Sequence, residues 1–289
     1  MTDHAAYTPA LKKRARHAPL GLSAVAVLVA AICLLPMVAV AIAAFSGGTG
    51  TVSQLLGSVL PRYVGNTALL VVLVSMGTLC LGVGAAWLVT MTRFPGVRLF
   101  EIALVLPLAF PSYVLAYVYT YILDHPGIVQ STLRDVMGWG PRDYWFPEVR
   151  SLGGAAFMLV LVLYPYVYLL VRASFLQQSG TTFFAARALG SSAWSAFFRV
   201  SLPLARPAIA GGVLLAVMET IADFGTVAYF GVQTFATGIY TSWFTLADRG
   251  GAAQLALCLL SFALLLAMLE RFQRGRAKYS DAARGGQEK

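Results

Sequence analysis

Six long apolar stretches divide this chain, and they constrain its fold more than any other feature. A helix needs about 20 predominantly apolar residues to cross a hydrocarbon core about 30 Å thick. Stretches of that length lie at Leu20–Phe45, Asn66–Met91, Leu99–Leu123, Ala155–Phe175, Pro207–Phe230 and Ala253–Leu269. The sequence therefore predicts an all-α membrane protein with six transmembrane helices.

The composition agrees with this class. The chain is 58% hydrophobic and 11% charged, with a mean hydropathy of +0.74, which excludes an ordinary soluble domain. Its net charge of +9 is interpreted as an orientation signal and as contact with membrane lipids, not as nucleic-acid binding. Cys33, Cys80 and Cys258 fall inside the predicted spans, so neither a disulfide framework nor a metal site is assigned.

The distribution of Lys and Arg orients the predicted helices. With the N-terminus inside, 16 of the 21 basic residues fall in inside segments. The outside segments hold only Arg62, Arg134, Arg142, Arg150 and Arg249. Because basic residues accumulate on the cytoplasmic side, both termini are predicted to be cytoplasmic.

The connector Phe183–Ile209 joins the fourth and fifth spans on the predicted cytoplasmic side. It has no acidic residue and carries Arg187, Arg199 and Arg206. We expect a partly helical segment that docks a partner.

The outside loop His125–Ser151 contains a short amphipathic piece, IVQSTLRDVMGW, in which apolar residues recur at near-helical spacing. The aromatic residues that follow suit the headgroup region, and they are Trp139, Tyr144, Trp145 and Phe146. An interfacial helix is expected here, with substrate gating as the alternative. In the preceding span, Pro107 and Pro111 should kink or loosen the helix.

Glu219 and Asp223 lie inside the fifth span, at positions i and i+4 of one helix face. Each acidic residue near the bilayer centre costs about 2.5–3.5 kcal/mol on insertion scales. Three interpretations remain open: protonated contacts between helices, pairing with a cation from a partner chain, or the lining of a wet substrate path. Glu101, near an end of the third span, is expected to reach the interface instead.

No phosphate-binding loop, H-E-x-x-H motif or nucleophile elbow occurs in the sequence. An enzymatic role is therefore not predicted, and no bound cofactor is expected. Uphill transport would draw on an ion gradient or on a separate ATP-hydrolysing partner.

The connector resembles the cytoplasmic loop of ABC importer permeases. That loop reads E-A-A, three residues, Gly, nine residues, then Ile-x-Leu-Pro. The matching residues are Ala185, Ala186, Gly190, Val200, Leu202 and Pro203, whereas Phe184 replaces the usual Glu. The resemblance implies a coupling helix that docks on an ATPase subunit. The residues that would form this contact are Phe184, Ala185, Ala186, Arg187, Gly190, Leu202 and Pro203.

A narrower resemblance, to the N-terminal half of ferric iron permeases, rests on YWFPEVRSLGGA, METIADFGTVAYFGVQTFATGIYTSWF and LADRGGAAQLAL. Those proteins commonly fuse two six-helix halves. The chain would then be either a half-size subunit or a fragment truncated in the linker, and a second six-helix permease half is implied.

Together these features predict a permease subunit of the bacterial inner membrane. Its parts would be a basic tail at 1–19, a six-helix domain at 20–270 with a coupling loop at 176–206, and a second tail or linker at 271–289. The resemblance implies ABC ATPase subunits that use ATP and Mg, and an extracytoplasmic substrate-binding protein. Ferric iron is the expected substrate, with Glu219 and Asp223 in the translocation pathway.

Other substrates and other classes of protein remain open. Thiamine, polyamine and phosphonate are alternative substrates. An ion-coupled secondary transporter would use Glu219 and Asp223 as a proton or sodium site. In a scaffold or channel-like protein the same acids would be structural.

Overall fold

The structure is a computed structural model that describes residues 20–46, 57, 59–141, 143–178 and 187–276. In these residues the regular structure is entirely helical. Four described helices are long and apolar enough to cross a membrane, and the number rises to six if each of two bent helix pairs counts as one span. The all-α prediction is confirmed, and the count of six spans stays a prediction.

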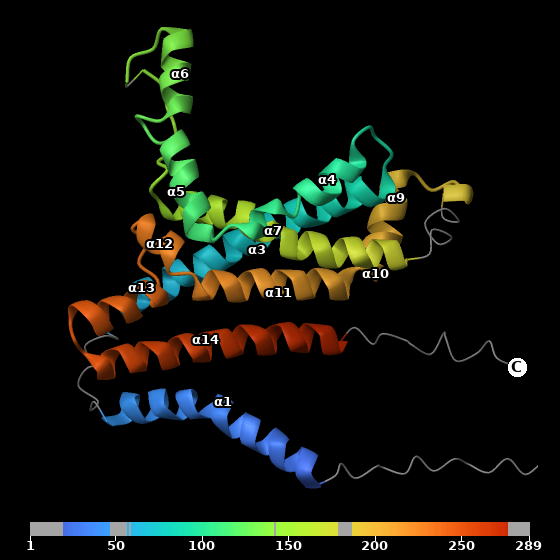
Figure 1. The fold of residues 1–289 in the computed structure, drawn as a ribbon. Helices are drawn as coiled ribbons and strands as arrows, with labels where there is room; N and C mark the ends of the chain where they lie inside the picture. Colours follow the sequence, from blue (N-terminus) through green and yellow to red (C-terminus); the bar gives the residue numbers. More distant parts are fainter. Residues whose placement is uncertain (1–19, 47–56, 58, 142, 179–186, 277–289) are drawn as a thin grey trace, which may run out of the picture.

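Three helices form the centre of the bundle, α3 (Leu60–Met91), α7 (Leu152–Gln177) and α11 (Arg206–Ala222). They lie side by side, with α14 (Arg249–Arg276) beside α11 and α1 (Leu20–Ser46) beside α14 (Figure 1). The side chain of Gln254 donates a hydrogen bond to the Ala44 carbonyl at 3.0 Å, which ties α14 to α1.

Glycines bring the three central backbones into close contact around Val167 of α7. A Cβ atom on Gly82 of α3 would lie 2.6 Å from Val167 Cβ, and one on Gly212 of α11 would lie 2.6 Å from Val167 Cα. Real side chains do not tolerate such distances, so only glycine permits this approach. Because close-packed interiors resist change in volume, α3, α7 and α11 form a rigid frame.

The predicted third span is broken. It consists of α4 (Val97–Ala103), the 3-10 turn η1 (Leu106–Ala109) and α5 (Ser112–Leu123). The segments Val97–Ala109 and Ser112–Met137 meet at 102°. Pro107 lies in η1 and Pro111 directly precedes α5. The proline positions thus mark the bend, as the sequence predicts.

The predicted fifth span, Pro207–Phe230, is wrong as a single helix. Helix α11 ends at Ala222, and Asp223 has extended backbone with φ −66° and ψ 124°. A new short helix, α12 (Gly225–Tyr229), follows it. At this break the Asp223 side chain accepts hydrogen bonds from the Val227 amide of α12 and from Ser112 Oγ, which lies far away in the sequence.

Two short helices complete the chain before α14, α13 (Phe235–Tyr240) and the π-helical turn η3 (Thr241–Thr245). The other end of the bundle carries α9 (Ala193–Ala196), the π-helical turn η2 (Phe197–Ser201) and α10 (Leu202–Leu204), which lead into α11 with a bend of 69°.

A helical arm extends away from the bundle (Figure 1). It consists of α5 and α6 (Ile128–Met137), and α6 confirms the amphipathic helix that the sequence predicts.

Candidate functional site

The two broken spans meet beside a cavity of about 290 Å³. Its apolar walls come from the stretch around η1 and from α7, and its polar lining groups are Ser112, Tyr166, Glu219 and Asp223. Although Asp223 lies beyond the end of α11 and so is not on one continuous helix face with Glu219, both side chains line this cavity. The described residues that line the cavity include two carboxylates and no basic side chain.

Asp223 is a well-satisfied polar group that joins the two breaks. Its Oδ1 accepts hydrogen bonds from Ser112 Oγ at 2.7 Å and Thr226 Oγ1 at 3.0 Å, and its Oδ2 accepts one from the Val227 amide at 3.1 Å. Ser112 begins α5, whereas Thr226 and Val227 belong to α12. The carboxylate therefore positions both helices against each other.

Glu219 lies on the last turns of α11 and is exposed. Within the described residues it makes no hydrogen bond or ion pair, although Tyr166 of α7 lies close enough for an electrostatic interaction. The two acids predicted as a pair thus have different surroundings. Asp223 is held by the fold, and Glu219 is left open to water, solute or another subunit.

Glu101 does not simply extend to the interface. Its carboxylate pairs with Arg172 of α7 at 3.0 Å, and its backbone carbonyl accepts a hydrogen bond from Tyr168 Oη at 3.4 Å. This ion pair fastens α4 to the central frame.

The connector is described only from Arg187, so Phe184, Ala185 and Ala186 of the predicted coupling contact lie outside the described residues. Arg187 and Gly190 are exposed, and Gly190 has a φ of +89°, in the left-handed region that favours glycine. Leu202 and Pro203 open α10, and Leu202 packs against a core cluster that includes Phe197.

An aromatic cluster that the sequence analysis missed attaches the connector to the bundle. Phe197 of η2 lies 5.3 Å from Trp87 of α3 and 6.4 Å from Phe175 of α7, measured between ring centroids. The available signal was the spacing of Trp194 and Phe197, which puts two large aromatics on one face of a short helix.

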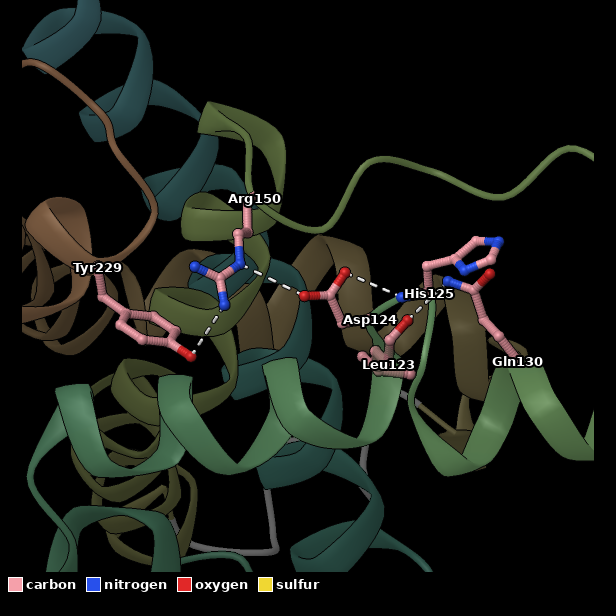
Figure 2. A network of polar contacts seen from close by, with 6 residues as sticks. All are labelled: Leu123, Asp124, His125, Gln130, Arg150 and Tyr229. Atoms are coloured by element: carbon pink, nitrogen blue, oxygen red, sulfur yellow. Dashed lines mark hydrogen bonds and ion pairs between the residues drawn. The ribbon is translucent and has the colours of Figure 1, made fainter. Parts of the chain in front are cut away.

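A polar network joins the middle of the arm, where α5 ends and α6 begins, to the start of α7 and to α12. Arg150 pairs with Asp124 at the end of α5 and reaches Tyr229 of α12, while Gln130 of α6 donates a hydrogen bond to the Leu123 carbonyl at 2.8 Å (Figure 2).

The predicted aromatic anchors of this loop have different surroundings. Tyr144 donates a hydrogen bond to Gln130 Oε1 at 2.7 Å and stacks on Trp139, with ring centroids 5.6 Å apart. Trp145 is 86% exposed, whereas Phe146 packs against the cluster of buried residues around α7. The loop is therefore held to α6 and to the bundle by Tyr144 and Phe146, whereas the Trp145 side chain is exposed.

Comparison with known proteins identifies the class. The model of the family described as "Binding-protein-dependent transport system inner membrane component" matches residues 78–279. The chain belongs to this family, and it is a permease subunit of the binding-protein-dependent type.

Curated relatives carry different substrate names. The Fe(3+)-transport system permease protein FbpB 2 of Haemophilus influenzae is 27% identical over 93% of this chain, which spans 49% of that protein. The Escherichia coli molybdenum transport system permease protein ModB is 32% identical over 65% of this chain and 81% of its own length. The Escherichia coli sulfate transport system permease protein CysW is 30% identical over 68% and 65%.

Solved structures show the same fold. A chain of the bacterial alginate ABC transporter, crystallised with an alginate pentasaccharide-bound periplasmic protein, superposes with a TM-score of 0.74 at 16% identity. The match covers 90% of this chain and 96% of that one. The chain thus has an ABC permease fold, and the expected permease resemblance is confirmed.

Proposed function

We propose that this chain is the permease subunit of an ATP-driven importer for ferric iron. In this proposal six spans place both termini in the cytoplasm, and the arm faces the outside. An extracytoplasmic binding protein delivers the substrate, and separate ABC ATPase subunits drive alternating access. The observation that best supports this proposal is the lining of the cavity. Among the described residues, this lining contains the carboxylates of Glu219 and Asp223 and no basic side chain.

The chemistry of the cavity favours a cation. Ferric iron is a hard cation and prefers oxygen ligands, which carboxylates supply. The relative named for Fe(3+) transport also matches nearly the whole chain. In contrast, an oxyanion would meet two like charges at this position, each unfavourable without a compensating cation.

The second candidate is an oxyanion permease, since the molybdenum and sulfate relatives reach 32% and 30% identity. A partner subunit would then have to supply the positive charge.

A second six-helix half completes the pathway in this proposal. The chain spans about half the length of the ferric relative, and the exposed Glu219 carboxylate has room for a facing subunit. The coupling loop, residues 176–206 with Arg187, Gly190, Leu202 and Pro203, would receive the ATPase. Phe184, Ala185 and Ala186 would complete this contact.

Uptake assays in membrane vesicles test the substrate. Radiolabelled ferric citrate, molybdate and sulfate are each offered with ATP inside the vesicles and the cognate binding protein outside. Iron uptake that needs ATP and falls in Glu219→Gln is the expected result. The matched control is Asp135→Asn, because Asp135 is an exposed acid on α6, outside the cavity lining.

Each contrary outcome has a distinct meaning. Uptake of molybdate or sulfate instead of iron would replace the substrate. Uptake that ignores ATP and collapses with the ion gradient would replace the whole class with a secondary transporter.

A further inference from the structure

Arg150 lies at a junction of three elements on the arm side of the bundle. It directly precedes Ser151, the N-cap of α7. Its Nε lies 3.3 Å from Oδ2 of Asp124, and its Nη2 donates a hydrogen bond to Tyr229 Oη at 3.4 Å (Figure 2). The guanidinium carbon lies 5.0 Å from the centroid of the Tyr229 ring, within cation–π range.

The partners of Arg150 close the far ends of α5 and α12. Asp124 is the C-cap of α5, and Tyr229 is the last residue of α12. The same two helices are also joined at Asp223, through Ser112, the first residue of α5, and Val227, the third residue of α12. Since the rings of Tyr117 and Tyr229 also meet edge to face at 5.8 Å, α5 and α12 form one unit, here called the gate pair.

The two ends of the gate pair are fastened with unequal strength. At Asp223 a half-buried carboxylate accepts three hydrogen bonds. At the far end the side chains of Arg150 and Asp124 are 52% and 34% exposed. Exposed ion pairs are weak and are screened by salt, so the polar contact at the far end breaks more readily than the one at Asp223. The other contact there is the packing of Leu123 and Tyr229 against the cluster of buried residues around α7.

Space for this movement lies next to the ion pair. A cavity of about 330 Å³ is lined by Asp124, His125, Glu148 and Arg150. The guanidinium can therefore leave Asp124 without entering a packed region. In contrast, α7 itself is fixed through Val167 between the glycines of α3 and α11.

We infer that Arg150 is the positioning residue of a reversible latch, which holds the gate pair to the base of α7 and releases it during the transport cycle. The inference rests on the proposed function, because it takes the arm side as extracytoplasmic and the cycle as ATP-driven. Release at the far end swings the gate pair about Asp223 and opens the cavity of Glu219 toward the outside.

Cross-linking tests the latch in vesicles that contain the whole transporter. Cys33, Cys80 and Cys258 are first replaced by Ala, and Asp124→Cys is combined with Arg150→Cys. A short, cleavable thiol cross-linker is applied without nucleotide and after trapping with ATP and vanadate. We expect the cross-linking yields of the two states to differ by about fivefold or more, as for an equilibrium shifted by nucleotide.

The pair Gln130→Cys and Tyr144→Cys is the matched control, because both residues belong to the arm and its loop. Its yield should be the same in both states. Because the two substitutions themselves remove the ion pair, uptake is compared with that of the same double-cysteine variant before cross-linking. Cross-linking at 124 and 150 should stop the ATP-driven iron uptake that this variant retains, and cleavage of the linker should return uptake to that level.

Failure of the latch can be distinguished from failure of the proposed function. If the parent without cysteines takes up iron with ATP, yet the 124–150 yield is constant and the cross-linked protein still transports, the latch is overturned. A parent with no ATP-driven uptake of iron, molybdate or sulfate would overturn the proposed function, and the latch with it.

Discussion

The indole of Trp87 stacks on that of Trp194, with ring centroids 5.1 Å apart and an interplanar angle of 28°. Trp87 belongs to the rigid frame and Trp194 to the connector, so this contact lies on the path between the proposed ATPase site and the spans. Trp194 is 61% exposed, and its ring also stacks on that of Phe198, with ring centroids 6.1 Å apart.

Replacing Trp87 should weaken coupling more than folding. An aromatic pair contributes about 1 kcal/mol beyond area burial, which is about a fivefold effect on an equilibrium. We expect Trp87→Leu to lower the ratio of iron uptake to ATP hydrolysis about fivefold, with Trp87→Phe restoring most of it. Uptake and hydrolysis are measured in the same vesicles, and an unchanged ratio in Trp87→Leu would contradict the role.

The two acids of the cavity should respond differently to substitution. Asp223→Ala leaves Ser112, Thr226 and the Val227 amide without their acceptor, at about 1–3 kcal/mol for each buried group left unpaired. We expect a lower midpoint of thermal unfolding in detergent for Asp223→Ala. Glu219→Gln should keep the wild-type midpoint while losing uptake. Equal midpoints for both variants would argue against the positioning role of Asp223.

Two substitutions at Gly190 distinguish the effect of backbone strain from the effect of a lost contact with the ATPase subunit. A Cβ there meets no atom within 4 Å among the described residues, but the φ of +89° costs other residues about 1–2 kcal/mol. We expect Gly190→Ala to bind the ATPase subunit nearly normally. Gly190→Asp should remain inserted in the membrane and lose the ATPase in pull-down experiments. Equal retention of the ATPase by both variants would show that no close contact forms at this position.

The frame itself is open to a direct test at Gly82. Gly82→Ala would force a Cβ atom into Val167 and the Tyr164 carbonyl, and overpacking costs about 1–3 kcal/mol. The unfolding midpoint and the yield of folded protein should both fall. Gly84→Ala is the matched control on the same helix, because nothing lies within 4 Å of its added Cβ. Similar losses in both variants would contradict the close approach at Gly82.

Much of the fold is readable from the sequence because long spans are governed by composition. The second and fourth predicted spans match α3 and α7 closely, since uninterrupted apolar runs leave a chain in lipid few alternatives. The bend at Pro107 and Pro111 is also predictable, because proline lacks the donor that a helix needs.

The break after Ala222 was not predictable by the same reasoning. Helical periodicity places Asp223 one turn after Glu219 on a continuous face. What decides otherwise is a tertiary contact with Ser112, which lies 111 positions away in the chain. The pairing of Arg150 with Asp124 and Tyr229 likewise depends on how distant segments pack, and no local sequence pattern predicts it.

At the two helix breaks, few backbone amide groups are left without a hydrogen-bond acceptor. At the first break the chain uses Pro107 and Pro111, which carry no amide hydrogen. At the second, the Asp223 side chain takes the Val227 amide that the preceding turn of helix cannot serve. Irregular backbone at membrane depth persists only where protein or water satisfies it. The two helices can therefore be interrupted at neighbouring positions without leaving many unpaired amides in the bilayer. At this interruption, water can reach a wall of the bundle that is otherwise apolar.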